Sequence, residues 1–171
     1  FAKLCAEAGI KFIGPPPSAI ERMGSKTAAL RVAKEAGAPV VPGSEGAIGS
    51  EAEARRVAAR IGYPVLLKAS AGGGGKGMRR VNAAADVAAA MRGAQSEAER
   101  AFGSNEIYVE KLIERPRHIE VQILGDERGH LIHLGERECS IQRRHQKVVG
   151  ECPSPLVLLQ PDLRDKLGEA A

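Results

Sequence analysis

The sequence predicts an α+β fold in which most strands pair antiparallel. Two strand-like segments follow each other across the glycine-rich stretch 71–77, and two more across the turn 125–129. Short connections of this kind join antiparallel neighbours. Helical segments with capping residues at their starts and glycines at their ends lie between these strand pairs. We therefore expect a mixed fold of helices and antiparallel strands.

Capping residues and glycines set the helix boundaries. Ser25 precedes a helical run that Gly37 ends. Ser50, with Glu53 three residues later, forms a capping-box pattern. Asn82 precedes an Ala-rich run and is the expected cap of that helix. The helices we expect are residues 3–9, 18–23, 26–36, 51–61, 83–102 and the segment from 163 onward.

Alternating apolar residues and turn residues mark the strands. The prolines 15–17 stop the first strand, and Gly125 to Gly129 supplies a hairpin turn. The strands we expect are residues 11–14, 64–68, 78–81, 106–113, 117–124 and 130–135. The segment 136–150 gives no clear pattern, and Pro153 with Pro155 indicates a loop.

Composition limits the function classes. The 171 residues are 43% hydrophobic but only 3% aromatic, with no Trp, so Ala, Val, Leu and Ile must build the core. The net charge of +4 is spread among interleaved acidic residues, which argues against a nucleic-acid partner. Three cysteines at wide spacing argue against a disulfide framework or a zinc site. No apolar run is long enough to cross a membrane, so we expect no membrane partner.

The glycine-rich stretch between two expected strands is the first candidate site. Gly72, Gly74 and Gly77 formally match GxGxxG, but strand-like residues follow where a Rossmann fingerprint requires a helix. The Walker A pattern fails as well. A strand–glycine loop–strand unit can wrap a polyphosphate with its N–H groups, and Lys68 and Lys76 flank it with cations. The alternative is a flexible surface loop. In either case we expect this loop to be the most mobile part of its domain.

The charged segment 136–147 is the second candidate. Gln142, His145 and Lys147 could together face a phosphate or a small oxyanion. Taken alone, a charge run of this kind is more often a solvated loop. His130 and His133 lack acidic company and are expected to be ordinary strand histidines.

Several motifs occur in a fixed order along the chain. Together they resemble the biotin carboxylases of the ATP-grasp superfamily over essentially the whole chain. The segment 12–20 is most similar to biotin carboxylases of acyl-CoA carboxylases, in particular the methylcrotonyl type. The motifs are Phe12-Ile-Gly-Pro-Pro16, Met23-Gly-Ser-Lys26, Gly62-Tyr-Pro-Val-Leu-Leu-Lys-Ala69, 72–78, Glu110-Lys111, Pro116-Arg-His-Ile-Glu-Val-Gln122 and 136–149.

The resemblance implies a reaction and a set of site residues. The family makes carboxyphosphate from bicarbonate and MgATP and then carboxylates biotin on a carrier domain. Lys147 would hold bicarbonate, and His118 would meet the ribose. The other implied contacts are Lys26 and Lys68 on the ATP phosphates, Gly74 and Gly75 through loop N–H groups, Glu110, Lys111 and Ile113 along the adenine, and Gln142 and His145 near the nucleotide.

The resemblance also implies a domain division. Residues 1–14 would end a Rossmann-like domain, 15–40 would be linker helices, 41–112 the ATP-grasp lid and 113–171 the start of the C-terminal ATP-grasp domain. The chain would thus be a central fragment with a partial ATP-grasp fold, inactive alone. The Mg²⁺ carboxylates and the general base would lie mostly outside it, so no metal ligand is expected within it.

Partners and location follow from the same resemblance. They are a biotin carboxyl carrier domain, a carboxyltransferase and a second copy in a homodimer or larger complex. The location would be the cytoplasm in a bacterium or the mitochondrial matrix in a eukaryote. Gly150 departs from the family, which usually has Glu there. The alternatives are another ATP-grasp ligase of the carbamoyl-phosphate synthetase type, or a non-catalytic nucleotide-binding module.

Overall fold

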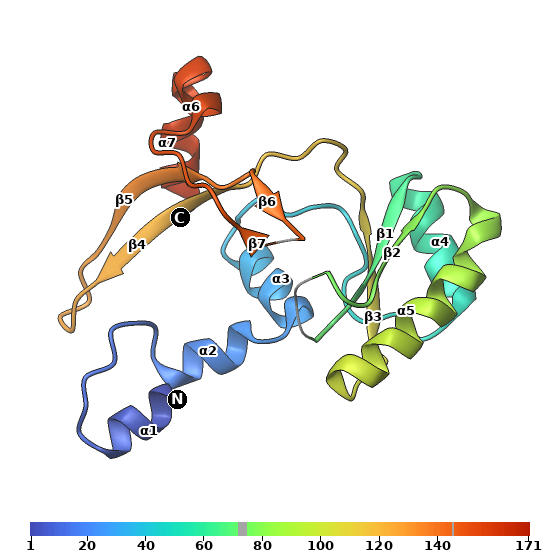
Figure 1. The fold of residues 1–171 in the computed structure, drawn as a ribbon, viewed down its shortest axis with the longest axis horizontal. Coiled ribbons are helices and arrows are strands. Elements are labelled where there is room, and N and C mark those ends of the chain that lie inside the picture. The colour runs from blue at the N-terminus through green and yellow to red at the C-terminus, as the bar shows by residue number, and fades with distance from the viewer. Residues whose placement is uncertain (72–74, 145) are drawn as a thin grey trace. The chain divides into compact units, whose positions relative to one another are not determined.

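The computed structural model describes residues 1–71, 75–144 and 146–171. The chain forms two compact units, Phe1–Leu112 and Ile113–Ala171. Within the described residues, each strand pairing is antiparallel, as the sequence predicts (Figure 1). No helix in this described part is long and apolar enough to span a membrane.

The first unit begins with three helices. They are α1 (Ala2–Glu7), α2 (Pro17–Met23) and α3 (Lys26–Glu35). The prediction of a strand at 11–14 is wrong, because this segment has no strand conformation and no strand partner. Without a neighbour, the backbone groups of an extended segment have no ladder to join. Ile13 is 92% exposed there.

A three-stranded sheet forms the centre of the first unit. Its strands β1 (Val65–Ala69), β2 (Met78–Val81) and β3 (Ile107–Lys111) lie in the order β2–β1–β3. The helices α4 (Glu51–Ile61) and α5 (Val87–Phe102) pack against it. Alternate strand residues, Val65 and Leu67 among them, join both helices in one apolar core. Both helices therefore cover the same sheet face, which leaves the opposite face to the other residues of each strand.

Local signals explain where the two packed helices begin and end. Ser50 Oγ accepts from the Glu53 N–H at 3.2 Å, and the Glu53 carboxylate accepts from the Gly49 N–H at 2.9 Å. This confirms the capping box, although the return bond goes to Gly49 rather than to Ser50. The cap expected at Asn82 is wrong: its side chain accepts from Arg80, and a 3₁₀ turn, η1 (Ala84–Asp86), precedes α5.

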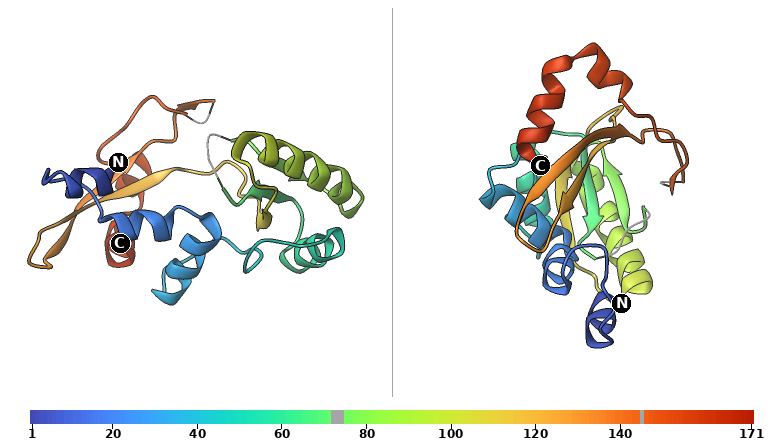
Figure 2. Two further views of the ribbon diagram at one scale, coloured as in Figure 1. Left: turned by 90° about the horizontal axis from the view of Figure 1, so that it is seen from below. Right: turned by 90° about the vertical axis from the view of Figure 1, so that its left-hand side faces the viewer.

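The second unit is built on a hairpin. Its strands β4 (Ile119–Gly125) and β5 (Leu131–Glu138) lie side by side in every view (Figures 1 and 2). At the turn, Asp126 Oδ1 accepts the N–H groups of Arg128 and His130 at 2.8 and 2.9 Å. This fixes the predicted hairpin. A smaller hairpin follows, with β6 (Gln142–Arg143) and β7 (Gln146–Lys147).

Two helices close the second unit where the sequence indicates a loop and one later helix. They are α6 (Pro155–Leu159) and α7 (Pro161–Ala170). Each has Pro in its first turn, where the missing N–H costs no helical bond. Ser154 caps α6 by accepting from the Val157 N–H at 3.4 Å. Pro153 lies in the predicted loop, but Pro155 begins α6, a helix that the sequence did not predict.

Two buried glutamates of β5 tie these helices to the hairpin. Glu138 is 1% exposed, and its carboxylate accepts from Ser140, Ser154 and Arg117 at 2.8, 2.7 and 2.6 Å. Glu136 accepts two bonds from Arg164 of α7, at 2.9 and 3.0 Å. A buried carboxylate is tolerated only when its lone pairs are satisfied. These contacts therefore fix α6 and α7 against β5.

Replacing Glu138 with Gln should destabilise the second unit at neutral pH, because an amide cannot neutralise Arg117 and accept from both hydroxyls equally well. Contacts with Ser154, Ser140 and Arg117 lower the pKa of Glu138 from 4.5 to about 2. The carboxylate therefore stabilises the fold above pH 4.5, and this contribution is lost as the pH falls toward about 2.

The measurement is the thermal unfolding midpoint of both proteins from neutral pH down to pH about 3. The gap between wild type and Glu138→Gln should narrow as the pH falls. Glu169→Gln, which alters an exposed carboxylate on α7, should change the midpoint little. A gap that stays constant or widens in acid would contradict the assignment.

Candidate functional site

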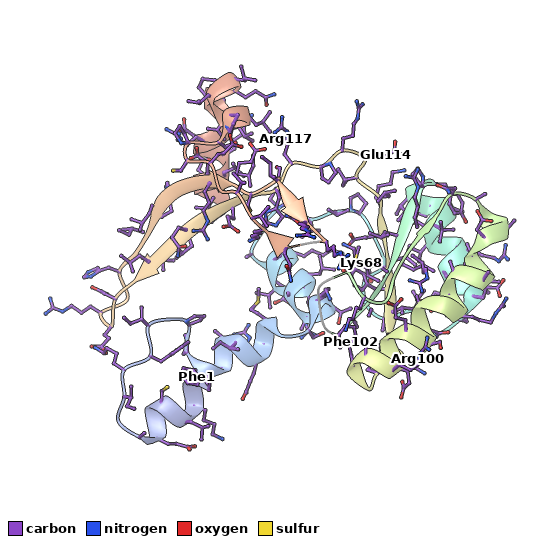
Figure 3. The ribbon with its side chains drawn as sticks, viewed as in Figure 1. Phe1, Lys68, Arg100, Phe102, Glu114 and Arg117 are labelled. Atoms are coloured by element: carbon purple, nitrogen blue, oxygen red, sulfur yellow. The ribbon has the colours of Figure 1, made fainter. Side chains whose placement is uncertain are left out.

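The face of the first sheet opposite the apolar core carries three neighbouring polar residues. Lys68 of β1 pairs in register with Tyr108 of β3, and Glu110 lies two residues further along β3. Side chains two apart share a face, and this face lies opposite the apolar core. The Lys68 ammonium and the Glu110 carboxylate form an ion pair (Lys68 is labelled in Figure 3). The Tyr108 phenol hydrogen-bonds to the same carboxylate, and burial with that negative charge raises the pKa of Tyr108.

Lys26 joins this cluster from the first turn of α3. Its ammonium donates to the Ala69 carbonyl at 3.3 Å, and its N–H donates to the Ser70 carbonyl at 3.3 Å. Burial lowers the pKa of Lys26, the nearby Lys68 lowers it further, and Glu110 opposes both effects. Two ammonium groups therefore lie close enough to interact with each other and with Glu110. Lysine side chains gathered in this way suit an anionic ligand.

The glycine loop meets this cluster at the end of β1. Gly75 and Gly77 have φ angles of +80° and +67°, which other residues adopt at a cost. A Cβ at Gly77 would lie 2.8 Å from that of Ala69. These glycines are therefore needed for the loop to return into β2. Gly74 lies outside the described residues. The predicted mobility of the loop also concerns residues 72–74, which are not among those described.

Lys111 does not join the cluster. Its ammonium donates to the carbonyls of Gly62 and Tyr63, both at 3.0 Å, at the connection from α4 to β1. It pairs in register with Val65, a core residue, so its side chain is on the face opposite Glu110. Only its backbone is available on the side of the cluster.

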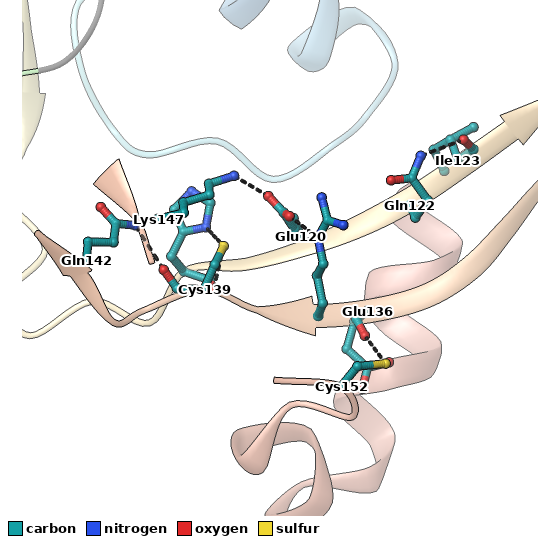
Figure 4. A network of polar contacts seen from close by, with 10 residues as sticks. Glu120, Gln122, Ile123, Glu136, Cys139, Gln142, Lys147 and Cys152 are labelled. Atoms are coloured by element: carbon teal, nitrogen blue, oxygen red, sulfur yellow. Dashed lines mark hydrogen bonds and ion pairs between the residues drawn. The ribbon is translucent and has the colours of Figure 1, made fainter. Parts of the chain in front are cut away.

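In the second unit, Glu120 joins two cations. Its carboxylate accepts from the Lys147 ammonium and from the Arg137 guanidinium (Figure 4). These bonds lower the pKa of Glu120 to about 2, so the carboxylate is charged at any ordinary pH. The Glu120 hydrogen bond raises the pKa of Lys147. Lys147 is therefore a fixed, fully protonated cation whose side chain remains 50% exposed.

His118 and Cys139 lie beside this group. The His118 N–H donates to Ser140 Oγ at 2.9 Å, and the His118 Nδ1 lies 2.7 Å from Cys139 Sγ. The Gln142 amide donates to the Cys139 carbonyl at 3.0 Å (Figure 4). The structure thus brings His118, Gln142 and Lys147 together on one hairpin region. Ile113, 49% exposed at the start of the unit, is not part of this network, and His145 lies outside the described residues.

Sequence reasoning missed four residues of these two clusters. Tyr108 and Glu120 each lie two positions from a predicted site residue in a strand, so alternation could have found them. Arg137 and Cys139 could not be found this way, because cross-strand pairing brings them in. His118, Glu120 and Cys139 also form a group whose possible ligand atoms lie within 4.8 Å of one another. The expectation of no metal ligand in the chain did not anticipate this group.

Similarity to known proteins adds to the evidence from the geometry. Residues 25–171 match the model of the carbamoyl-phosphate synthase L chain, ATP binding domain. The chain belongs to this family. Within it, the chain is 54% identical over its full length to biotin carboxylase of Nostoc sp. strain PCC 7120 and 53% identical to methylcrotonoyl-CoA carboxylase subunit alpha of Oryza sativa. It spans 38% and 23% of those proteins.

A solved structure shows the same similarity to biotin carboxylases. The biotin carboxylase domain of 2-oxoglutarate carboxylase from Hydrogenobacter thermophilus, a dimer in complex with MgADP, ADP and bicarbonate, is 51% identical with a TM-score of 0.89. The match covers 99% of this chain and 37% of that one. The resemblance to biotin carboxylases and the α+β ATP-grasp fold are thereby confirmed. The methylcrotonyl subtype stays a prediction, because the two relatives are nearly equally similar.

The Glu120 ion pairs predict how readily Lys147 reacts. In the Glu120→Gln variant, the pKa of Lys147 should fall. An amine-reactive reagent should then label Lys147 faster than in the unchanged protein under mildly alkaline conditions. Arg137→Gln is the matched control, because Arg137 lowers the pKa of Lys147 by repulsion, and its loss should slow labelling. Peptide mass spectrometry measures both rates. Equal rates in the two variants would contradict the arrangement.

Proposed function

We propose that this chain is the part of a biotin carboxylase that binds ATP and bicarbonate. In the full protein, ATP and bicarbonate would give carboxyphosphate, and biotin on a carrier domain would then be carboxylated. The observation that carries the proposal is the Lys68–Glu110 ion pair with Lys26 beside it, in a chain that is similar over its full length to biotin carboxylases. Because the chain spans 38% of its Nostoc relative, the complete reaction is assigned to the parent protein.

The lysine pair suits the ATP phosphates. Phosphoryl transfer depends on positioning and on neutralising the charge that develops on the phosphates. Lys26 and Lys68 would bind phosphate oxygens, and the N–H groups of Gly74 and Gly75 would close over them. Glu110 holds Lys68 in place by an ion pair. An arriving phosphate would then compete with Glu110 for an ammonium that is already positioned.

The remaining contacts would fix the nucleoside. Glu110 and the backbone of Lys111, with Ile113, would line the adenine. The assignment of Lys111 to its backbone is supported by its ammonium, which is bound to the Gly62 and Tyr63 carbonyls. His118 would meet the ribose, and Gln142 and His145 would lie near the nucleotide. The Gln142 side-chain nitrogen donates to the Cys139 carbonyl. This bond orients the amide and leaves its oxygen as the atom that could accept a hydrogen bond from the nucleotide.

Lys147 would hold bicarbonate. Its ammonium is half exposed and kept protonated by Glu120. A charged donor held in one position can bind a small oxyanion and orient it without first reorganising. Glu120 would thus position the lysine. The other oxygen of the Glu120 carboxylate is bound by the Arg137 guanidinium.

Magnesium does not fit the residues described near these lysines. Mg²⁺ prefers an octahedron of oxygen ligands that includes carboxylates. The carboxylate of Glu110 is already bound to Lys68 and Tyr108, and that of Glu120 to Lys147 and Arg137. We assign the Mg²⁺ ligands and the general base to the rest of the parent protein. Its partners would be a biotin carrier domain, a carboxyltransferase and a second copy of the subunit.

Replacing Lys68 or Lys147 by Met in the parent protein should lower bicarbonate-dependent ATP turnover by at least about 100-fold, because each change removes a charge from a developing anion. Phosphate release measures the effect. Lys166→Met, at an exposed site on α7, is the control and should retain turnover. A Lys147→Met protein with near-normal bicarbonate-dependent turnover would refute the bicarbonate assignment.

Residues 1–171 alone should show no bicarbonate-dependent ATPase activity and should bind MgATP weakly. The lysines neutralise phosphate charge, but phosphoryl transfer also needs a fixed metal ion. The test mixes the purified chain with MgATP, bicarbonate and free biotin and follows phosphate release. Turnover that disappears in the Lys147→Met version of the same chain would show that the site is complete without the rest.

A further inference from the structure

Tyr108 is buried although it lies on the polar face of the first sheet. Its side chain is 3% exposed. It lies directly across from Lys68 in the register of β1 and β3, and Glu110 follows two residues later on the same face. The proposed ATP contacts use Lys68 and Glu110 but give no role to Tyr108. A buried phenol between these two charged groups can therefore contribute through them.

The Tyr108 phenol and the Lys68 ammonium hold the same carboxylate. The phenol donates a hydrogen bond to Glu110. Burial, followed by the negative charge of Glu110, raises the pKa of Tyr108, so the phenol keeps its proton at any ordinary pH and remains a donor. The Lys68 ammonium forms its ion pair with the same group. Glu110 is thus held from two sides, along β3 by a phenol and across from β1 by an ammonium.

ATP binding would break one of these two contacts, a step that rests on the proposed function. A phosphate would take the Lys68 ammonium from Glu110, whose side chain is only 15% exposed. A carboxylate buried to this extent is costly when it loses a partner and no other donor remains. Lys26, which also interacts with Glu110, is assigned to the phosphates as well. Among these described contacts, the phenol is the one that no phosphate removes.

These observations give Tyr108 a role in ATP binding. We propose that Tyr108 is a positioning residue, whose phenol keeps the Glu110 carboxylate satisfied and in place while the Lys68 ammonium passes from Glu110 to a phosphate. The phenol touches neither ATP nor the reacting atoms, and it acts through Glu110. Because both residues belong to β3, their hydrogen bond does not depend on where the Lys68 side chain points.

Tyr108→Phe in the parent protein removes the hydroxyl and keeps the ring. The dissociation constant of MgATP, measured by calorimetry without bicarbonate, should rise about tenfold, because Glu110 loses a hydrogen bond that matters most after Lys68 has left it. The KM for ATP should rise to a similar extent. By contrast, kcat at saturating ATP and the KM for bicarbonate should change less than about twofold. A smaller folded fraction would instead lower kcat and leave both KM values unchanged.

Tyr63→Phe is the matched control. The Tyr63 phenol oxygen is buried and has no hydrogen-bond partner among residues 1–71, 75–144 and 146–171. Its ring packs against the apolar core of the same unit. Removing a hydroxyl that makes no hydrogen bond costs no such contact. The Tyr63→Phe protein should therefore bind MgATP as the parent does.

A double-mutant comparison tests whether Tyr108 acts through Glu110. In a Glu110→Ala background, adding Tyr108→Phe should change MgATP binding less than about twofold, because the hydrogen bond is already absent. A tenfold effect that persists in this background would show that Tyr108 acts independently of Glu110 and would overturn the proposal. Circular dichroism shows whether each variant is folded, and if Glu110→Ala is not, the comparison of Tyr108→Phe with Tyr63→Phe decides.

The results separate the role of Tyr108 from the proposed function. A Tyr108→Phe protein that binds MgATP as tightly as the parent, or no more weakly than Tyr63→Phe, would overturn the role while the function stands. A parent protein that binds MgATP but shows no bicarbonate-dependent turnover would refute the function, and weaker binding in Tyr108→Phe would still support the role. A parent that binds no MgATP would refute both.

Discussion

The strict alternation of side chains in the central sheet of the first unit is the constraint on which the candidate site depends. One face of β1 and β3 is apolar because α4 and α5 cover it. The intervening residues must then point to the other side. Lys68, Tyr108 and Glu110 are therefore presented together by the same packing that builds the core. A one-residue register shift would exchange the two faces, so the apolar core also fixes where the charged residues lie.

Two of the lysines assigned to an anion are each held by a strand carboxylate. Lys68 is held by Glu110, and Lys147 is held by Glu120. The Lys147–Glu120 pair is partly exposed, so it contributes little to stability because solvent screens it. Its consequence here is positional: a long, flexible side chain is kept in one place before a ligand arrives. The two units thus use the same device with different residues, a strand glutamate that orients a lysine.

The second unit uses buried carboxylates differently. Glu136 and Glu138 are nearly inaccessible to solvent and are bound by arginine and serine side chains from segments before and after the hairpin. These bonds hold α6 and α7, whereas the apolar core of this unit is small. Ser140 connects this structural cluster to His118, because its hydroxyl donates to Glu138 and accepts from the His118 N–H. The position of His118 therefore depends on a buried carboxylate to which no ligand contact is assigned.

The sequence by itself determined the features that depend on near neighbours. The capping box at Ser50, the strands on either side of the glycine loop and the main hairpin follow from residues a few positions apart. The predictions of a strand at 11–14 and of a cap at Asn82 were wrong, and helix α6 from Pro155 was missed, because these features depend on partners that local patterns do not reveal. Motif resemblance placed Lys26, Lys68, His118 and Lys147 in one family site, but it gave no account of their contacts.

Only the tertiary structure decided those contacts. Glu120 meets Lys147 across 27 residues, and His118 meets Cys139 across 21. Lys111, adjacent to Glu110 in sequence, points to the other face and binds the Gly62 and Tyr63 carbonyls instead. The physical reason is that strand pairing is set by register between distant segments, and register is fixed by burial of the whole sheet face rather than by any single residue. The sequence thus determined which charged groups are present, and the folded sheet and hairpin decided which of them act together.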